Sequence, residues 1–205
     1  MNYFVTAIGT DSGKTLVSAI LTEALQADYW KPVQSGKENR DIETVSKLIN
    51  NGHSCCYEES YLLTLPMSPH AAAKADGERI NLDSIILPDN GGNNIVIEGA
   101  GGVLVPLNEK DFVIDLAVKF DAEVILVSNN YLGSINHTLL TVQELKRRNI
   151  KVKGIIFNGI PNPESEAFIL NFSGYRCLLR VAQEKIISQE IITHYAIKLF
   201  ENWDE

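Results

Sequence analysis

The chain has 205 residues, 45% of them hydrophobic, and this size suits a single compact domain over residues 1–205. Its 18 Lys and Arg side chains are outnumbered by 26 Asp and Glu side chains, which gives a net charge of −8. A molecule of this charge repels polyanions, so neither nucleic acid nor an acidic membrane surface is expected as a partner, and any phosphate must be held by a local site.

Short apolar runs alternate with longer amphipathic segments, a pattern typical of βα units that build a parallel sheet. In chain order the predicted elements are strand 3–7, helix 14–26, strand 28–33, helix 42–50, strand 94–97, helix 113–119, strand 123–127, helix 135–148, strand 152–157, helix 164–171 and helix 184–201. Loops are predicted at Gly52 and over residues 89–93 and 160–163. The predicted fold class is therefore doubly wound α/β, with a mostly parallel sheet flanked by helices and with ligands at the C-terminal ends of the strands.

The first predicted strand leads into a segment that resembles a phosphate loop and then into a helix. Its residues are Gly9, Thr10, Asp11, Ser12, Gly13, Lys14 and Thr15. Backbone amides at the start of the helix would cradle phosphates, Lys14 would neutralise them, and the Thr15 hydroxyl could ligate Mg²⁺. The strict spacing requires glycine at position 8, where this chain has Ile8. The alternative is that Gly13-Lys14-Thr15 only starts a helix.

Polar residues also stand near the ends of two further predicted strands. Lys31, Ser35 and Gly36 end the second strand region, and Asp41 follows them as either an N-cap or a metal ligand. Glu98 comes directly after the third strand, where a carboxylate could hold Mg²⁺ against nucleotide phosphates. For these segments the alternatives are an ordinary surface lysine and a tight glycine turn.

Two later segments are weaker candidates. Residues 132–137 open a helix, so their free amides could receive a carboxylate, although Ser134 could equally be only an N-cap. Asn158 follows the last predicted strand and is either part of a turn or an amide that reads the edge of a base. His70 and His137 are taken as structural, because most histidines lack the partner that chemistry requires.

Cysteine usage and the start of the chain indicate a cytoplasmic protein. Cys55 and Cys56 are adjacent, and with Cys177 they cannot all pair, which fits a reducing compartment. The first residues lack the regions of a secretory signal, and no run approaches the roughly 18 apolar residues of a membrane span.

Taken together in this order, the motifs resemble the dethiobiotin synthetase family, which consists of homodimeric phosphate-loop enzymes. The matching pieces are residues 6–15, residues 31–36, Asp41, residues 68–70, residues 98–107, residues 132–137 and Asn158. The chain departs from the family at Ala7, at Asp11, and over residues 178–183, which lack a Gly-x-Ile-Pro type of sequence near the nucleotide base.

The resemblance implies an enzyme that uses ATP, Mg²⁺ and carbon dioxide or bicarbonate to close a cyclic urea on 7,8-diaminononanoate. It assigns catalysis to Thr10, Lys14, Lys31 and Ser35, and Mg²⁺ binding to Thr15, Asp41 and Glu98. It assigns nucleotide binding to Asp11, Ser12, Gly13, Lys14, Thr15, Leu16 and Asn158. It assigns substrate binding to Lys31, Ser35, Gly101, Gly102, Val103, Leu132, Gly133, Ser134 and Asn136, with the last four supplied across a homodimer interface.

Two other classes remain as alternatives. One is another synthetase that forms an acyl phosphate, which would usually carry a glutaminase domain. The other is a switch ATPase of the partition or septum-positioning type, which predicts a second lysine in the phosphate loop and a basic amphipathic tail. The loop offers only Lys14, and residues 201–205 read Glu-Asn-Trp-Asp-Glu, which is acidic rather than basic.

Overall fold

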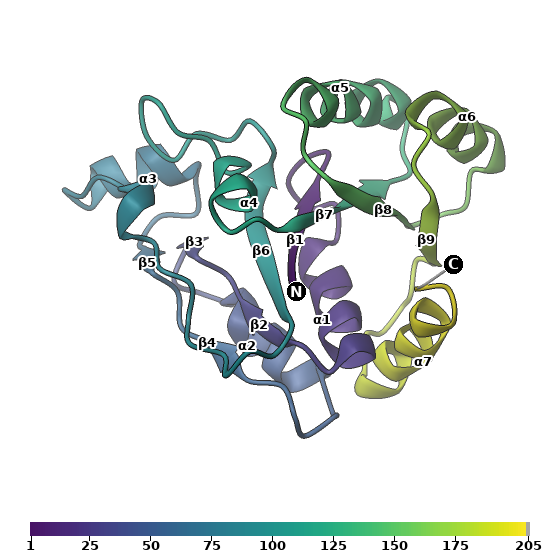
Figure 1. Cartoon of the computed structure of the whole chain (residues 1–205), viewed down its shortest axis with the longest axis horizontal. Helices are drawn as coiled ribbons and strands as arrows, with labels where there is room; N and C mark the ends of the chain where they lie inside the picture. The colour runs from purple at the N-terminus through teal and green to yellow at the C-terminus, as the bar shows by residue number, and fades with distance from the viewer. Residues whose placement is uncertain (204–205) are drawn as a thin grey trace.

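Within residues 1–203, which the structure describes, seven strands form the central sheet of this computed structural model (Figure 1). Their spatial order is β4-β2-β6-β1-β7-β8-β9, and every neighbouring pair is parallel. The strands are β1 (Asn2–Ala7), β2 (Asp28–Trp30), β4 (Cys56–Tyr57), β6 (Ile95–Gly102), β7 (Glu123–Asn129), β8 (Val152–Asn158) and β9 (Cys177–Val181). The predicted doubly wound parallel fold is confirmed.

Helices pack against both faces of this sheet, as Figure 1 shows. On one face, α1 (Lys14–Leu25) contacts both α2 (Asp41–Leu48) and α7 (Gln189–Glu201). The opposite face packs against α4 (Asp115–Lys119), α5 (Ser134–Arg147) and α6 (Pro163–Ser173). Two short helices, α3 (Pro69–Ala75) and the 3-10 turn Leu82–Ser84, complete the set in the described chain.

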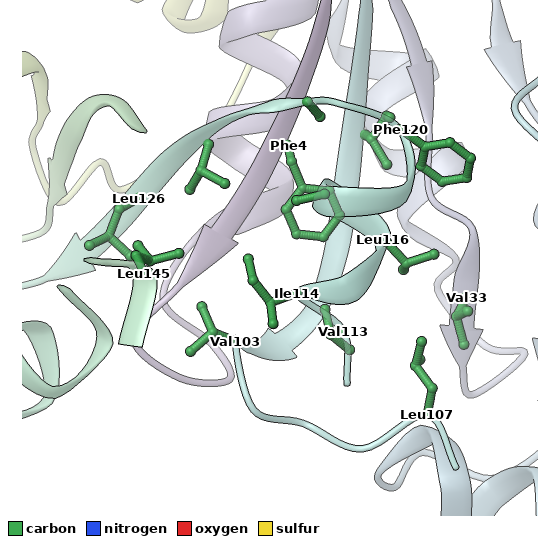
Figure 2. Close-up of a cluster of buried hydrophobic side chains, with 14 of the residues drawn as sticks. Phe4, Val33, Val103, Leu107, Val113, Ile114, Leu116, Phe120, Leu126 and Leu145 are labelled. Carbon is green, nitrogen blue, oxygen red and sulfur yellow. The ribbon is translucent and has the colours of Figure 1, made fainter. Parts of the chain in front are cut away.

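Alternation along the strands divides the core into two clusters, because successive side chains of a strand point to opposite faces. In β1, Tyr3 and Val5 pack towards α1, whereas Phe4 packs towards α4. Figure 2 shows Phe4 near the centre of the second cluster, above Ile114 and Leu116. Apolar residues at consecutive strand positions are therefore buried on both sides, as the sequence predicted.

The predicted strand 28–33 is wrong as a single element. It divides into β2 in the main sheet and β3 (Val33–Ser35), which pairs with β5 (Tyr61–Leu63) in a separate two-stranded sheet. Pro32 lies at the break and has no amide hydrogen with which to continue a ladder. The change of sheet leaves Lys31 between the two strands, at the edge where ligands are expected.

Several element boundaries also differ from the prediction. The last helix begins at Gln189 rather than at residue 184, because the Ser188 side chain accepts from the amide of Ile191 and caps it there. The helix predicted from residue 113 begins at Asp115, and Asp41 is the first residue of α2, whose N-cap is Arg40. The N-cap alternative for Asp41 is therefore wrong.

Five elements were not predicted from the sequence: β4, β5, β9, α3 and the 3-10 turn. The predicted third strand also ended too early, since β6 continues to Gly102 and Glu98 lies inside it. The acidic end of the chain includes Asp204 and Glu205, which lie outside the described residues. No helix in the described part of the chain is long and apolar enough to cross a membrane.

Candidate active site

Three neighbouring strands, in the order β2-β6-β1, bring polar residues to one edge of the sheet. Lys31 follows β2, Glu98 lies in β6, and the segment before Lys14 follows β1. Because these strands are parallel, their C-terminal ends meet on the same side. The structure thereby places Lys14, Lys31 and Glu98 around one cavity with a volume of ≈ 680 Å³.

The loop between β1 and α1 has the shape of an anion cradle. Gly13 is the N-cap of α1 and has a left-handed backbone with φ 94°. The Ser12 hydroxyl and the Lys14 ammonium both donate to the carbonyl of Gly9, each at 3.2 Å, so the loop closes on itself. No described side chain caps the start of α1. Its first amides are therefore available to an anion such as a phosphate.

Two carboxylates and a hydroxyl meet beside this loop. The Thr15 hydroxyl lies 2.9 Å from Asp41 Oδ1 and 3.0 Å from Glu98 Oε1. The Lys31 ammonium donates to Asp41 Oδ2 and, at 3.1 Å, to Glu98 Oε1. Glu98 is only 1% exposed, and the phenol of Tyr29 donates to its second oxygen at 2.9 Å. Every oxygen of this buried carboxylate has a donor, which a buried charge requires.

Burial and the carboxylates of Asp41 and Glu98 shift the pKa values of Lys14 and Lys31 in opposite directions. Burial by itself would lower the pKa of Lys31, but the charges of Glu98 and Asp41 outweigh it and raise that pKa above its ordinary value. Burial lowers the pKa of Lys14, and the Glu98 carboxylate opposes this effect only partly. Burial and the charge of Glu98 hold the pKa of Tyr29 well above its usual value, so its phenol remains a donor. An anion bound at Lys14 would favour the charged form of that lysine.

The cavity is lined by the two loops, the carboxylates and the turn before α3. Its lining residues include Thr10, Asp11, Gly13, Lys14, Thr15, Lys31, Gln34, Ser35, Asp41, Ser68, Glu98 and Gly101. The Ser35 hydroxyl is buried and has no hydrogen-bond partner among the described residues. Because this hydroxyl also lines the cavity, it is available to a bound ligand.

A second, more apolar hollow adjoins the first. It has a volume of ≈ 430 Å³, and Thr10 and Val105 line both. Gly102 and Val103 contribute to it from the end of β6 and the residue after it, and His137 contributes from α5. The sequence-predicted substrate residues Gly101, Gly102 and Val103 therefore lie along a continuous path between the two hollows.

The four predicted residues at the start of α5 do not line the first cavity. Leu132 is fully exposed, Asn136 and Gly133 are also exposed, and Ser134 is buried with 2% exposure. Gly133 is the N-cap of α5, so the N-cap alternative for Ser134 is wrong. Within a single chain these residues are not brought together with Lys14 and Lys31.

Asn158 connects the phosphate loop to a third hollow of ≈ 320 Å³. Its side-chain amide donates to the carbonyl of Ser12 at 2.9 Å. Asp11, Leu16 and Asn158 line the hollow together with residues that follow β7, β8 and β9. A planar base could lie there with its phosphates at the loop.

Sequence reasoning missed two residues of this region. Tyr29 was read only as part of an apolar strand, and nothing local to it reveals that its hydroxyl reaches β6. The half-buried Asn129 lines the third hollow with a buried side-chain oxygen that has no partner among the described residues. The signal available for Asn129 was its place two residues after the predicted strand 123–127, on the side where ligands are expected.

The fold alone places the chain in a broad class. The septum site-determining protein MinD of Pyrococcus horikoshii superposes with a TM-score of 0.59 and 14% sequence identity. The match covers 100% of this chain and 97% of the MinD chain. A ParA family ATPase of Chlorobium tepidum superposes with a TM-score of 0.58 and 12% sequence identity. The match covers 96% of this chain and 98% of the ATPase. The chain matches the AAA domain family over residues 1–190. The parallel sheet with a phosphate loop after β1 thus defines a phosphate-loop nucleotide-binding protein.

Two relatives narrow this class. The ATP-dependent dethiobiotin synthetase BioD of Cytophaga hutchinsonii is 64% identical over 203 residues, which cover 99% of this chain and 98% of the relative. The protein of the same name from Christiangramia forsetii is 48% identical, over 96% of this chain and 95% of the relative. The chain belongs to the family of ATP-dependent dethiobiotin synthetases and is an ATP-dependent ligase. The family predicted from the ordered motifs is confirmed, and the partition-type proteins share only its fold.

Proposed function

We propose that this chain catalyses the Mg²⁺- and ATP-dependent closure of the ureido ring of dethiobiotin from 7,8-diaminononanoate and carbon dioxide. The supporting observation is the meeting of two lysines, two carboxylates and a free hydroxyl around one cavity at the phosphate loop. Carbamate and triphosphate are both anions, so bringing them together requires positive charge between them. Lys14 and Lys31 provide that charge from opposite loops.

The reaction divides into three steps. One amine adds to carbon dioxide and loses a proton, which gives a carbamate. A carbamate oxygen attacks the γ-phosphorus of ATP, which releases ADP and leaves a carbamic-phosphoric anhydride. The second amine attacks the carbonyl carbon of this anhydride, inorganic phosphate leaves as the C–O bond to it breaks, and the nitrogen loses a proton as the ring closes. No covalent intermediate with the protein is required, so the residues act by positioning and by stabilising charge.

We assign the carbamate to Lys31 and Ser35, and the transferring phosphate to Lys14 and the amides that begin α1. Lys31 is charged and reaches the cavity from the end of β2. The unpartnered Ser35 hydroxyl lines the same cavity. Thr10 lines both adjoining hollows, where a group can contact carbamate and phosphate together.

The donors around Thr15 fit Mg²⁺. Among residues 1–203 no group of three His, Cys, Asp or Glu side chains could hold a metal alone. Mg²⁺ is ordinarily held by one or two carboxylates together with substrate phosphates and water. Here the Thr15 hydroxyl lies 2.9 Å from an oxygen of Asp41 and 3.0 Å from an oxygen of Glu98, so a hydroxyl and two carboxylates converge. When bound there, the ion would neutralise phosphate charge. Lys31 donates to the same two carboxylates, at Asp41 Oδ2 and Glu98 Oε1, so a cation held there would compete with its ammonium and leave it freer to meet the carbamate.

For the nucleotide, we assign the base to the hollow beside Asn158, Asp11 and Leu16. The side-chain nitrogen of Asn158 donates to Ser12, and its side-chain oxygen accepts from no described residue. This oxygen is the group that we expect to accept from the amine of adenine. Ser12 and Gly13 would contact the phosphates through their backbone.

We also infer a homodimer in the cytoplasm, with the start of α5 supplying Leu132, Gly133, Ser134 and Asn136 to the partner's substrate. Exposed apolar side chains at Leu104 and Leu140 line the second hollow, and Leu132 is exposed just before α5; exposed apolar patches commonly mark protein interfaces. Three free cysteines fit a reducing compartment. Light scattering after size exclusion should give twice the chain mass of 22.7 kDa. A single 22.7 kDa species at micromolar concentration would contradict the shared site.

The decisive test of the activity uses labelled bicarbonate. The purified protein should fix the label into an acid-stable product only when 7,8-diaminononanoate, Mg²⁺ and ATP are all present. Free carbamate loses its carbon dioxide in acid, so an acid-stable label reports ring closure. Omission of each component in turn is the control. If no stable label forms with all three present, the proposed function is wrong.

A further inference from the structure

Tyr29 makes a buried contact to the active site that the reaction so far leaves unexplained. The residue is 0% exposed, and its hydroxyl donates to Glu98 Oε2 at 2.9 Å. In the parallel pairing of β2 with β6, Tyr29 lies opposite Val96, two residues before Glu98. Extended residues two positions apart share a face, so Tyr29 in β2 and Lys31, directly after β2, approach the same carboxylate.

Tyr29 and Lys31 donate to different oxygens of Glu98. Lys31 donates to Oε1 at 3.1 Å, and the Thr15 hydroxyl lies 3.0 Å from the same atom. Tyr29 donates only to Oε2. Since the last torsion of a glutamate side chain rotates broadly, a carboxylate without this phenol could tilt its plane away from the cavity. The phenol holds the far oxygen and therefore fixes the carboxylate plane, with the other oxygen facing Thr15 and Lys31.

We propose that Tyr29 is a positioning residue whose hydroxyl orients the Glu98 carboxylate so that Oε1 is presented to a divalent cation beside Thr15 and Asp41. This inference rests on the proposed function, because it assumes that Glu98 holds Mg²⁺. Groups that orient a metal ligand typically change metal affinity by about 10- to 100-fold when removed. A hydroxyl that only stabilises the fold would leave metal affinity unchanged.

The test is Tyr29→Phe, which keeps the buried ring and removes one oxygen atom. Mn²⁺ binding is titrated by electron paramagnetic resonance in the presence of ADP, and ADP binding is titrated without metal. We expect the Mn²⁺ dissociation constant to rise about 10-fold or more, with metal-free ADP affinity unchanged. In steady state, the Mg²⁺ concentration for half-maximal rate should rise by a similar factor, while kcat at saturating Mg²⁺ stays nearly constant.

Tyr57→Phe is the matched control, because its hydroxyl also bonds to a carboxylate, Asp28 Oδ2, at 3.1 Å. Neither residue lines the 680 Å³ cavity. The control should bind Mn²⁺ like the unmodified protein. Equal Mn²⁺ affinity in Tyr29→Phe and Tyr57→Phe would overturn the proposal, even if thermal unfolding showed that both changes reduce stability.

A second pair of variants covers the case in which Tyr29→Phe does not fold. 4-Aminophenylalanine and 4-methylphenylalanine at position 29 match in size, but only the first can donate a hydrogen bond. The amino variant should bind Mn²⁺ more tightly than the methyl variant, and equal affinities would again reject the proposal. Mn²⁺ binding with ADP does not require ring closure. A failed bicarbonate assay beside a Tyr29 effect would therefore count against the reaction and not against the positioning role.

Discussion

Lys31→Ala is expected to lower kcat by about 10²- to 10³-fold, the range found when one preorganised charged or polar donor is removed from an active site. The affinity for Mg-ATP should change little. The hydrogen bonds of Lys31 go to Asp41 and Glu98, whereas Lys14 belongs to the loop that would hold the phosphates. We therefore expect the lost charge to affect the carbamate and its transition state rather than the nucleotide.

The variant leaves two carboxylates without their ammonium, which would be costly for a buried pair. Tyr29 and Thr15 still donate to Glu98. Measurements with Mg²⁺ present also provide a cation for Asp41 and Glu98. We therefore expect the folded variant to accept Mg-ATP, and a thermal unfolding curve with Mg²⁺ present should verify the fold.

Calorimetric titration with a non-hydrolysable ATP analogue measures the binding, and the labelled-bicarbonate assay measures the turnover. Lys47→Ala is the control, since Lys47 is an exposed lysine on α2 and lies outside the cavity. It should match the unmodified protein in both measurements. Loss of nucleotide binding in Lys31→Ala would show that the assignment of phosphate to Lys14 and carbamate to Lys31 is wrong.

The strands that could be predicted from sequence are those with helices on both faces. β7 and β8 carry continuous apolar runs, because they lie inside the sheet. β9 is an edge strand in which Arg180 is exposed, so its pattern is broken. β4 has only two residues, which is too short for any periodic signal.

Part of the candidate site could also be predicted, because it lies at the C-terminal ends of predictable strands. The rule that ligands lie at the C-terminal ends of parallel strands selected Lys14, Lys31 and Glu98 without knowledge of the strand order. It could not predict that Pro32 diverts the chain and leaves Lys31 beside Asp41. Nor could it find Tyr29, because its contact with Glu98 depends on the register between β2 and β6.

Gly13→Ala should weaken nucleotide binding strongly, because the loop requires a backbone that only glycine adopts freely. Gly13 has φ +94°, and a Cβ there would lie 2.2 Å from Asn158 Nδ2. The left-handed backbone alone costs about 1–2 kcal/mol for a residue with a side chain, which is about 5- to 30-fold in a dissociation constant. Displacing Asn158 adds to this, since its amide holds the Ser12 carbonyl.

The backbone strain of Gly13→Ala should weaken ATP binding and not only lower the stability of the fold. An empty loop can relax away from the strained conformation, but a bound triphosphate requires the native loop with its amides aligned. Gly77→Ala is the matched control: its φ is +74°, and nothing lies within 4 Å of the added Cβ. Both variants carry backbone strain, yet only Gly13→Ala should lose ATP affinity in the calorimetric titration. If Gly13→Ala bound ATP as Gly77→Ala does, the segment after β1 would not be the phosphate cradle, because strain at its N-cap would then have no ligand to affect.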